Sequence, residues 1–344
     1  MYTGFYRLKG LPFQLGPDPR FFFGSSVHQK AMAYVTYGLH QGEGFIVITG
    51  DIGAGKTTLV GHLLATLDPA KYIAATLVTT QLEADDTLRM VASAFGVPCE
   101  GADKAVLLRR IEAFLAGTMH GGRRSLLVVD EVQNLSVRAL EELRMLSNFS
   151  ANGVPLLQSF LLGQPQFRAT LANPGLEQLR QRVTASYHLG PLGADETRAY
   201  IEHRLKLVEW SGDPGFTDEA FGRIHAVTGG VPRKINTLCS RLLLSGYLDE
   251  RHEIDEAVVD QVADELGEEI AQVTTPGPSD LDFAMAANGG NGHVQLNGHG
   301  NGSYNGSGDL PLRVSMLESQ MRNHDRTIKR ALEIAANYLA SARS

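Results

Sequence analysis

The sequence predicts an α/β protein with a parallel sheet covered by helices on both faces, followed by a small all-helical domain. Three observations lead to this fold class. A glycine-rich loop at residues 50–57 lies between a short apolar segment and a segment with helical spacing. Apolar segments then alternate with helical ones over residues 43–192, as in parallel sheets that are buried on both faces. Over residues 193–273 only helical spacing remains.

Residues 1–42 form a lead-in to this core. Phe13 follows a proline, and residues 17–23 read Pro-Asp-Pro-Arg-Phe-Phe-Phe. We expect this stretch to be an irregular segment packed on the core. A helix is expected to follow it over Val27–Gly38, where apolar residues recur at helical spacing.

The glycine-rich loop reads Gly-Asp-Ile-Gly-Ala-Gly-Lys-Thr and fits the phosphate-binding pattern GxxxxGK[ST]. Its glycines allow successive N–H groups to point at phosphate oxygens, and the N-terminus of the following helix adds partial positive charge. Lys56 is expected to reach the β- and γ-phosphates, and Thr57 to offer its hydroxyl to Mg²⁺. The chain is therefore predicted to bind a nucleoside triphosphate through Gly50, Asp51, Ile52, Gly53, Ala54, Gly55, Lys56, Thr57 and Thr58.

The strand candidates are short apolar segments rich in β-branched residues. They are Phe45–Thr49, Ile73–Val78, Leu126–Val129, Leu156–Leu162 and Ala185–Leu189. Helices are expected between them, for example Ala139–Asn148.

The third strand candidate ends in adjacent carboxylates, Asp130 and Glu131. Phosphoryl transfer depends mainly on charge neutralisation and positioning. Asp130 is expected to lie beside the metal ion. Glu131 is expected to orient and deprotonate the water that attacks the γ-phosphate. Its presence therefore predicts that the chain hydrolyses the nucleotide as well as binding it.

Four further polar residues are candidates for the site. Arg180 and Arg182 precede the last strand candidate and are either solvated or serve as an arginine finger for the γ-phosphate in a neighbouring subunit. Arg233 follows Pro232, which suits the first turn of a helix, and from there can fold back over the nucleotide. Gln164 follows a strand candidate and either contacts the γ-phosphate or its attacking water, or has a packing role in the loop.

The composition narrows the functional classes. Over 344 residues the formal net charge is −7, which does not favour nucleic-acid binding by the whole molecule. The two cysteines, Cys99 and Cys239, do not have the spacing of a metal site. Neither a signal peptide nor an apolar run of transmembrane length is recognisable. We expect a cytoplasmic protein, at most peripheral to a membrane.

The C-terminal part changes in composition. Residues 274–309 are rich in Gly, Asn and Ser, which predicts a flexible linker. Residues 310–344 return to helical spacing and predict an amphipathic helix that docks on a partner or on another copy of the chain.

The order of these motifs resembles that of AAA+ ATPases of the P-loop NTPase class. More narrowly, residues 1 to about 270 are similar to general-secretion ATPases of the ExeA/GspA type, especially the ATPase associated with exosortase (XrtA, PEP-CTERM) and exopolysaccharide loci. The similarity rests on the aromatic and proline residues of the lead-in and on the motifs at residues 50–58, 130–135, 140–148, 162–165, 178–182 and 230–239.

The resemblance implies an ATPase that uses ATP and Mg²⁺. Thr57 and Asp130 would then hold the metal and Glu131 would be the catalytic base. Gln164 would be the first sensor, and Arg233 the second, in a helical lid. The resemblance also implies a ring-like homo-oligomer, which in this family is commonly a hexamer, and a protein partner in an envelope export system. ExeA-type relatives carry a transmembrane helix and a peptidoglycan-binding domain after the ATPase, where this chain has the linker and short helix.

Three rival interpretations follow from the same motifs. A DNA-dependent ATPase of the transposition-regulator type shares much of the core, although the acidic charge disfavours it. A scaffold that binds ATP and scarcely hydrolyses it is disfavoured by Glu131. A kinase is disfavoured because no acceptor site is recognisable beside the loop.

Overall fold

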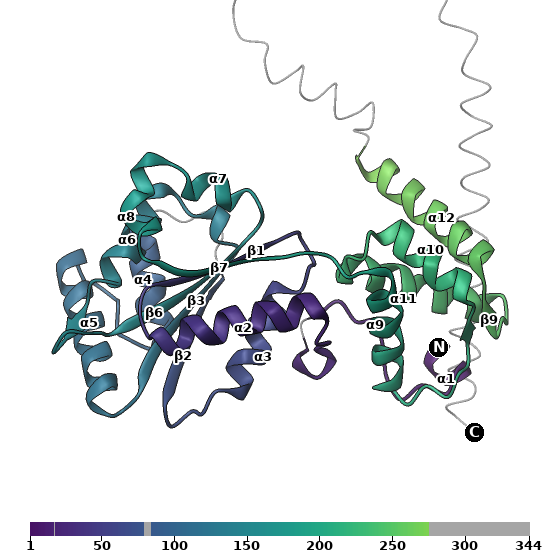
Figure 1. Ribbon diagram of the computed structural model, residues 1–344, viewed down its shortest axis with the longest axis horizontal. Helices are drawn as coiled ribbons and strands as arrows, with labels where there is room; N and C mark the ends of the chain where they lie inside the picture. The colour runs from purple at the N-terminus through teal and green to yellow at the C-terminus, as the bar shows by residue number, and fades with distance from the viewer. Residues whose placement is uncertain (17, 79–83, 275–344) are drawn as a thin grey trace, which may run out of the picture. The chain divides into compact units, whose positions relative to one another are not determined.

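The computed structural model describes residues 1–16, 18–78 and 84–274 (Figure 1). Beyond Thr274, the expected linker and C-terminal helix lie outside the described residues. A five-stranded parallel sheet with the strand order β2-β3-β6-β1-β7 organises the first part of the chain. Its strands are β1 (Phe45–Gly50), β2 (Tyr72–Val78), β3 (Arg124–Asp130), β6 (Leu157–Gly163) and β7 (Val183–Leu189).

The central strands are buried on both faces, which explains their continuous apolar sequence. Every residue of β1 and β6 is buried. In the register of the sheet, Phe45 of β1 lies opposite Ser159 of β6 and Val183 of β7. All five predicted strands are found within a residue or two of their expected bounds, and the parallel α/β fold class is confirmed.

Helices cover both faces of the sheet (Figure 1). Alternate residues of β1 face different hydrophobic clusters: Phe45 and Val47 pack with residues of α4, α5 and α6, whereas Ile46 and Ile48 pack with residues of α2 and α3. These helices are α2 (Ser26–Gln41), α3 (Lys56–Thr66), α4 (Ala84–Ala94), α5 (Lys104–His120) and α6 (Val137–Leu146).

Shorter elements connect these layers. They are α1 (Tyr2–Phe5), the 3₁₀ turns η1 (Pro19–Phe21), η2 (Val132–Asn134) and η3 (Pro174–Leu176), the antiparallel pair β4 (Ser150–Ala151) and β5 (Val154–Pro155), and the helices α7 (Phe167–Leu171) and α8 (Glu177–Arg180).

A helical region follows the sheet and has a hydrophobic cluster of its own. It comprises α9 (Ala194–Lys206), α10 (Asp218–Thr228), α11 (Pro232–Leu248) and α12 (Glu256–Thr274). The expectation of an all-helical region was incomplete, because β8 (Gly215–Phe216) and β9 (Glu253–Ile254) form a short parallel pair there. Each strand leads directly into a helix, so pairing them sets the starts of α10 and α12 side by side.

We expected the lead-in to pack on the α/β core, and for its first part this expectation is wrong. Tyr6, Leu8 and Phe13 are buried in the hydrophobic cluster of the helical region. The Tyr6 hydroxyl donates a hydrogen bond to the Arg251 carbonyl at 2.9 Å. Phe22 stacks on His62 of α3 and α2 lies on the sheet, so the lead-in runs from the core of the helical region to the α/β core. Its large apolar side chains complete the small core of the helical region.

Within the parts of the chain that the structure describes, no helix is both long and apolar enough to cross a bilayer.

Candidate nucleotide-binding site

The glycine-rich loop joins the C-terminal end of β1 to the first turn of α3. It curls around the Lys56 ammonium group, whose Nζ donates to the carbonyl oxygens of Gly50 at 2.8 Å and Asp51 at 3.0 Å. Gly53 and Gly55 have φ angles of +83° and +97°, a region that L-amino acids with a Cβ avoid. The loop therefore has the backbone curvature that the sequence pattern predicts.

The next residues bring a hydroxyl and a carboxylate together. Thr57 Oγ1 donates to Asp130 Oδ2 at 2.6 Å, although the two residues lie on α3 and at the end of β3. Asp130 is 7% exposed, and its Oδ1 accepts a hydrogen bond from the Glu131 backbone N–H at 2.9 Å. Mg²⁺ prefers such oxygen ligands and is commonly bound through one or two carboxylates together with substrate phosphates. This pair of side chains fits that ion.

Glu131 follows Asp130 in a left-handed backbone conformation, with φ +52°. The chain turns at this point into η2, and the Glu131 carboxylate contacts two glutamine side chains. Its Oε2 accepts from the amides of Gln133 and, at 3.3 Å, Gln164. The Gln164 backbone N–H also donates to Gln133 Oε1 at 3.0 Å. The structure thus brings the predicted residues Glu131 and Gln164 together.

The charges of the site act on Lys56 in opposite directions. Burial lowers the pKa of its ammonium group, while the carboxylates of Glu131, Asp130 and Asp51 raise it, with burial the larger effect. One ammonium group is thus surrounded by several carboxylates. A polyphosphate entering this site would meet that negative charge unless a divalent cation accompanied it.

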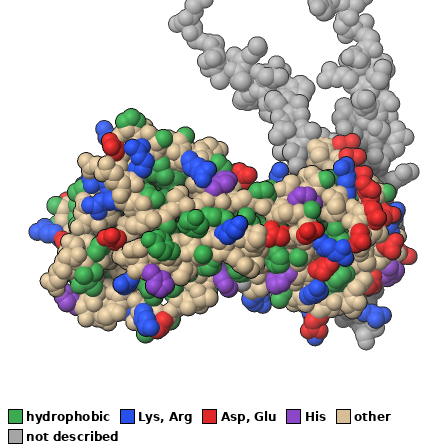
Figure 2. All heavy atoms as spheres, in the orientation of Figure 1, with side chains coloured by type: hydrophobic (Ala, Val, Ile, Leu, Met, Phe, Trp, Pro, Cys, Tyr) green, Lys and Arg blue, Asp and Glu red, His purple; other side chains and the backbone are tan. Residues whose placement is uncertain are grey.

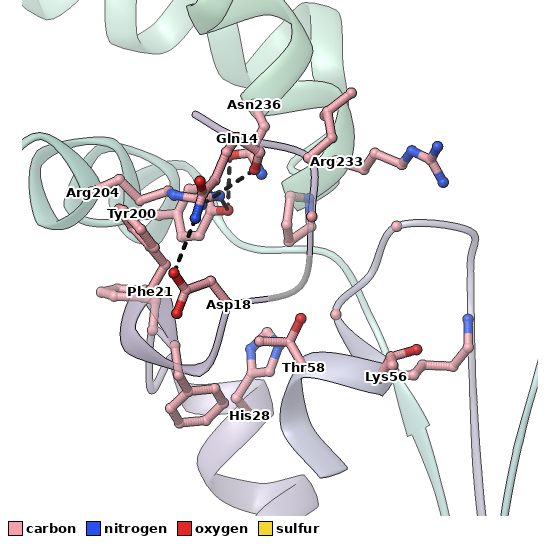
Figure 3. A pocket seen from close by; sticks show the side chains of 18 of the residues that line it. Gln14, Asp18, Phe21, His28, Lys56, Thr58, Tyr200, Arg204, Arg233 and Asn236 are labelled. Carbon is pink, nitrogen blue, oxygen red and sulfur yellow. Dashed lines mark hydrogen bonds between the residues drawn. The ribbon is translucent and has the colours of Figure 1, made fainter. Parts of the chain in front are cut away.

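A cavity of about 240 Å³ opens beside the loop (Figure 3). Its walls come from three parts of the chain: the lead-in, the loop with the start of α3, and the helical region. Representative lining residues are Gln14, Asp18, Phe21, His28, Lys56, Thr58, Tyr200, Arg204, Arg233 and Asn236. A ligand whose phosphates occupy the loop would extend between the lead-in and the helical region.

Residues 39–171 match a family model described as an AAA domain. Over these residues the chain is similar to an AAA domain. It is 38% identical over 255 residues to general secretion pathway protein A of Aeromonas hydrophila, an alignment that covers 74% of this chain and 46% of that protein. The expected relationship to this secretion protein is confirmed, while the chain spans less than half of its length. The narrower likeness to the exosortase-associated ATPase stays a prediction.

Solved structures support the fold of the AAA domain and the helical region. The ORC2 protein of Aeropyrum pernix in its ADP form aligns with a TM-score of 0.56 and 17% identity, covering 74% of this chain and 73% of that one. The ORC1 protein of the same organism in complex with DNA aligns with a TM-score of 0.54 and 16% identity, covering 77% and 72%. At such low identity the likeness establishes the P-loop AAA+ fold alone.

Arg233 contacts the loop of the AAA domain through its backbone. The residue lies in the first turn of α11, and its N–H donates to the Gly53 carbonyl at 3.2 Å. A Cβ at Gly53 would lie only 2.2 Å from the Arg233 Cβ, so the two backbones pack directly against each other. The side chain is exposed and points away from Gln14, Tyr200 and Arg204 (Figure 3).

The other two arginines predicted for the site, Arg180 and Arg182, lie away from the loop. The Arg182 carbonyl accepts from the N–H of Phe45, the first residue of β1, which places it at the opposite end of the strand from the loop. Its Nη1 donates to the backbone and hydroxyl oxygens of Ser147, both at 3.1 Å. Arg180 is exposed and makes one long hydrogen bond, at 3.4 Å, to the Leu171 carbonyl. Neither reaches the nucleotide site of its own AAA domain.

A buried polar cluster in the cavity wall was missed by sequence reasoning. Tyr200 donates to Asn236 Oδ1 at 2.9 Å, and Arg204 donates to the Tyr200 hydroxyl at 2.8 Å. The Arg204 guanidinium also lies 4.6 Å from the centre of the Phe21 ring and bonds the Gln14 carbonyl at 3.4 Å. It thereby joins the lead-in to α9. The residues of this cluster do not follow any motif spacing. In the sequence, only the presence of polar residues at helix positions that face a core could have indicated the cluster.

Proposed function

We propose that the AAA domain binds ATP together with Mg²⁺ at residues 50–58 and hydrolyses it. The observation that carries this proposal is the contact between Thr57 and Asp130 beside Glu131, at the edge of a cavity bounded by the helical region. In this proposal Lys56 turns from the loop carbonyls to the phosphates, and Thr57 and Asp130 hold the metal ion, whose chemistry is to neutralise phosphate charge.

Glu131 is the proposed catalytic base. Its carboxylate is already oriented by the amides of Gln133 and Gln164, which would fix its position relative to an attacking water. Gln164 is therefore a positioning residue for the base as well as the proposed first sensor. The exposed Arg233 guanidinium is free to turn toward the phosphates when the helical region closes.

Phosphate release from ATP by the purified chain tests the proposal. Wild type should hydrolyse ATP with Mg²⁺ and lose this activity in excess EDTA. Glu131→Gln should retain ATP binding and lower kcat by about 10²–10⁴-fold, the usual contribution of a general base. Equal turnover by wild type and Glu131→Gln would instead support a nucleotide-gated scaffold.

The AAA domain is further proposed to act as a ring-like homo-oligomer. Arg180 and Arg182 lie away from their own loop, so an arginine finger would have to come from a neighbouring subunit. Such head-to-tail contacts close into a ring when the rotation permits. The ATPase rate per chain should then rise with protein concentration, whereas a rate independent of concentration would contradict completion of the site by a neighbour.

The pathway we propose is envelope export, in the exopolysaccharide or PEP-CTERM sorting class, with the protein acting in the cytoplasm or peripherally at the inner membrane. The relationship to general secretion pathway protein A supports the export part of this proposal. In the native cell, a Lys56→Ala allele should abolish export of the surface polymer or protein. Unchanged export in that strain, with normal protein levels, would refute it.

A DNA-dependent ATPase is the alternative, and charge argues against it. Acidic side chains gather over the helical region (Figure 2), and α12 carries several exposed carboxylates and neither Lys nor Arg. Such a surface repels a polyanion. Stimulation of the ATPase by duplex DNA, decreasing steeply with salt, would favour this alternative over export.

A further inference from the structure

One buried histidine in the cavity wall contacts the phosphate-binding loop. His28, in the first turn of α2, is 6% exposed. Its ring lies against the loop backbone at Ala54 and Gly55, and its Nε2 would lie 2.9 Å from a Cβ at Gly55. Its Nδ1 lies 2.7 Å from Ser25 Oγ. The imidazole therefore fills the space against the last glycine of the loop.

The orientation of this ring is fixed at both nitrogens. Nε2 is the nitrogen beside the loop, and Nδ1 is hydrogen-bonded to the Ser25 hydroxyl. The same hydroxyl oxygen accepts the His28 backbone N–H at 3.3 Å and so caps α2. The ring is thus held by the helix to which it belongs.

Two other contacts of the loop differ in how a ligand affects them. Lys56 donates to the Gly50 and Asp51 carbonyls, bonds that are lost if its ammonium group turns to phosphate. The Arg233 backbone contacts Gly53 from the helical region. The His28 ring lines the same cavity and lies against the loop at Gly55, so the turn of the Lys56 side chain need not disturb this contact.

A glutamate of the helical region contacts the start of α2, the helix that carries His28. Glu196, in the first turn of α9, accepts the Ser26 N–H at 2.6 Å through Oε1, and its Oε2 accepts the Gly193 N–H at 3.4 Å. The carboxylate therefore lies at the N-terminus of α2, where negative charge is favourable. It joins the starts of α9 and α2 directly beside His28.

We propose that His28 is a positioning residue for the phosphate-binding loop and that Glu196 holds it from the helical region. The inference rests on the proposed function, because its consequence is nucleotide affinity. Movement of α9 would change the position of the α2 N-terminus and, through His28, the curvature of the loop. The helical region would thereby set how tightly the loop holds phosphate.

Nucleotide binding and turnover of full-length variants test this. His28→Ala should weaken binding of a fluorescent ATP analogue and raise KM about fivefold to tenfold, with kcat changed less than about twofold, the scale of one lost hydrogen bond and its packing. His28→Gln places an amide donor near Nε2 and should restore most of the affinity. His62→Ala is the matched control, because His62 stacks on Phe22 at 4.1 Å without contacting the loop, and should behave as wild type.

Glu196→Ala should also weaken binding, and adding it to His28→Ala should have little further effect because both act through one contact chain. Fully additive effects would remove Glu196 from the proposal. Affinity in His28→Ala equal to wild type, or a fall in kcat at constant KM as from partial misfolding, would overturn the role of His28.

Amide hydrogen exchange provides a readout independent of ATP binding. Residues 50–55 should exchange faster in His28→Ala than in wild type and His62→Ala, without nucleotide. If wild type binds no ATP but this difference is found, the proposed function fails and the contact stands. Identical exchange in all three proteins would refute the positioning role whatever the outcome with ATP.

Discussion

A methyl group at Gly53 should separate the helical region from the phosphate-binding loop. The Cβ of Gly53→Ala would lie 2.2 Å from the Arg233 Cβ, far inside the normal contact distance of about 3.5–4 Å between carbons. Alanine at a φ of +83° costs about 1–2 kcal/mol. Moving α11 away also weakens the bond from the Arg233 N–H to the Gly53 carbonyl, about 1 kcal/mol. We expect a loss of about 2–3 kcal/mol in the free energy of unfolding.

Urea unfolding followed by circular dichroism measures this loss. Gly61→Ala is the matched control: Gly61 lies within α3, its φ is not positive, and a Cβ there would have nothing within 4 Å. This control should stabilise the protein by about 0.5–1 kcal/mol, since alanine is the better helix former. The two substitutions should therefore shift the midpoint in opposite directions. A Gly53→Ala protein as stable as wild type would refute the reasoning.

Further predictions concern other parts of the site. Arg182→Ala should lower the free energy of unfolding by about 1–2 kcal/mol, and with it the thermal midpoint, because two hydrogen bonds to Ser147 are lost. Arg180→Ala should leave the midpoint unchanged. Equal midpoints for the two variants would contradict this. Asp130→Asn should raise the Mg²⁺ concentration for half-maximal hydrolysis at least about tenfold, measured by metal titration; an unchanged titration would remove Asp130 from the metal site. Burial lowers the pKa of His28 from 6.5, so stability is full above that pH and falls as the pH drops toward the folded-state pKa. Between pH 7 and 5, the urea midpoint of His28→Gln should therefore fall less than that of wild type, and an equal fall would speak against a buried neutral ring.

The sequence contained the parts of the site that follow one another along the chain. The loop at residues 50–57 and the carboxylates Asp130 and Glu131 come directly after buried strands. Because the strands of a parallel sheet end at the same edge, both groups were expected at that edge. Their direct contact depends on the strand order, in which β1 and β3 lie on either side of β6. The strand order itself could not be read from the sequence, since apolar periodicity does not say which strands are neighbours.

The contacts that distant segments make with the loop could not be predicted. His28, Glu196 and the Arg233 backbone come from three distant segments, and their meeting depends on where the helical region packs. A buried histidine on a helix has no local pattern that distinguishes it from an exposed one. The Arg204 cluster was hidden for the same reason.

In the helical region, the predicted and observed structures differ for another reason. Strands as short as Gly215–Phe216 and Glu253–Ile254 are below the length at which alternation can be recognised. The destination of Tyr6 and Phe13 was ambiguous because either apolar core could accept them.

The central claim is that the loop binds ATP through Lys56, and equilibrium binding of radiolabelled ATP with Mg²⁺ tests it most directly. Wild type should bind ATP saturably, with one site per chain. Lys56→Ala should bind at least about 100-fold more weakly, because a charge-assisted contact to phosphate is lost. Equal binding by the two proteins, or none by folded wild type, would contradict the account.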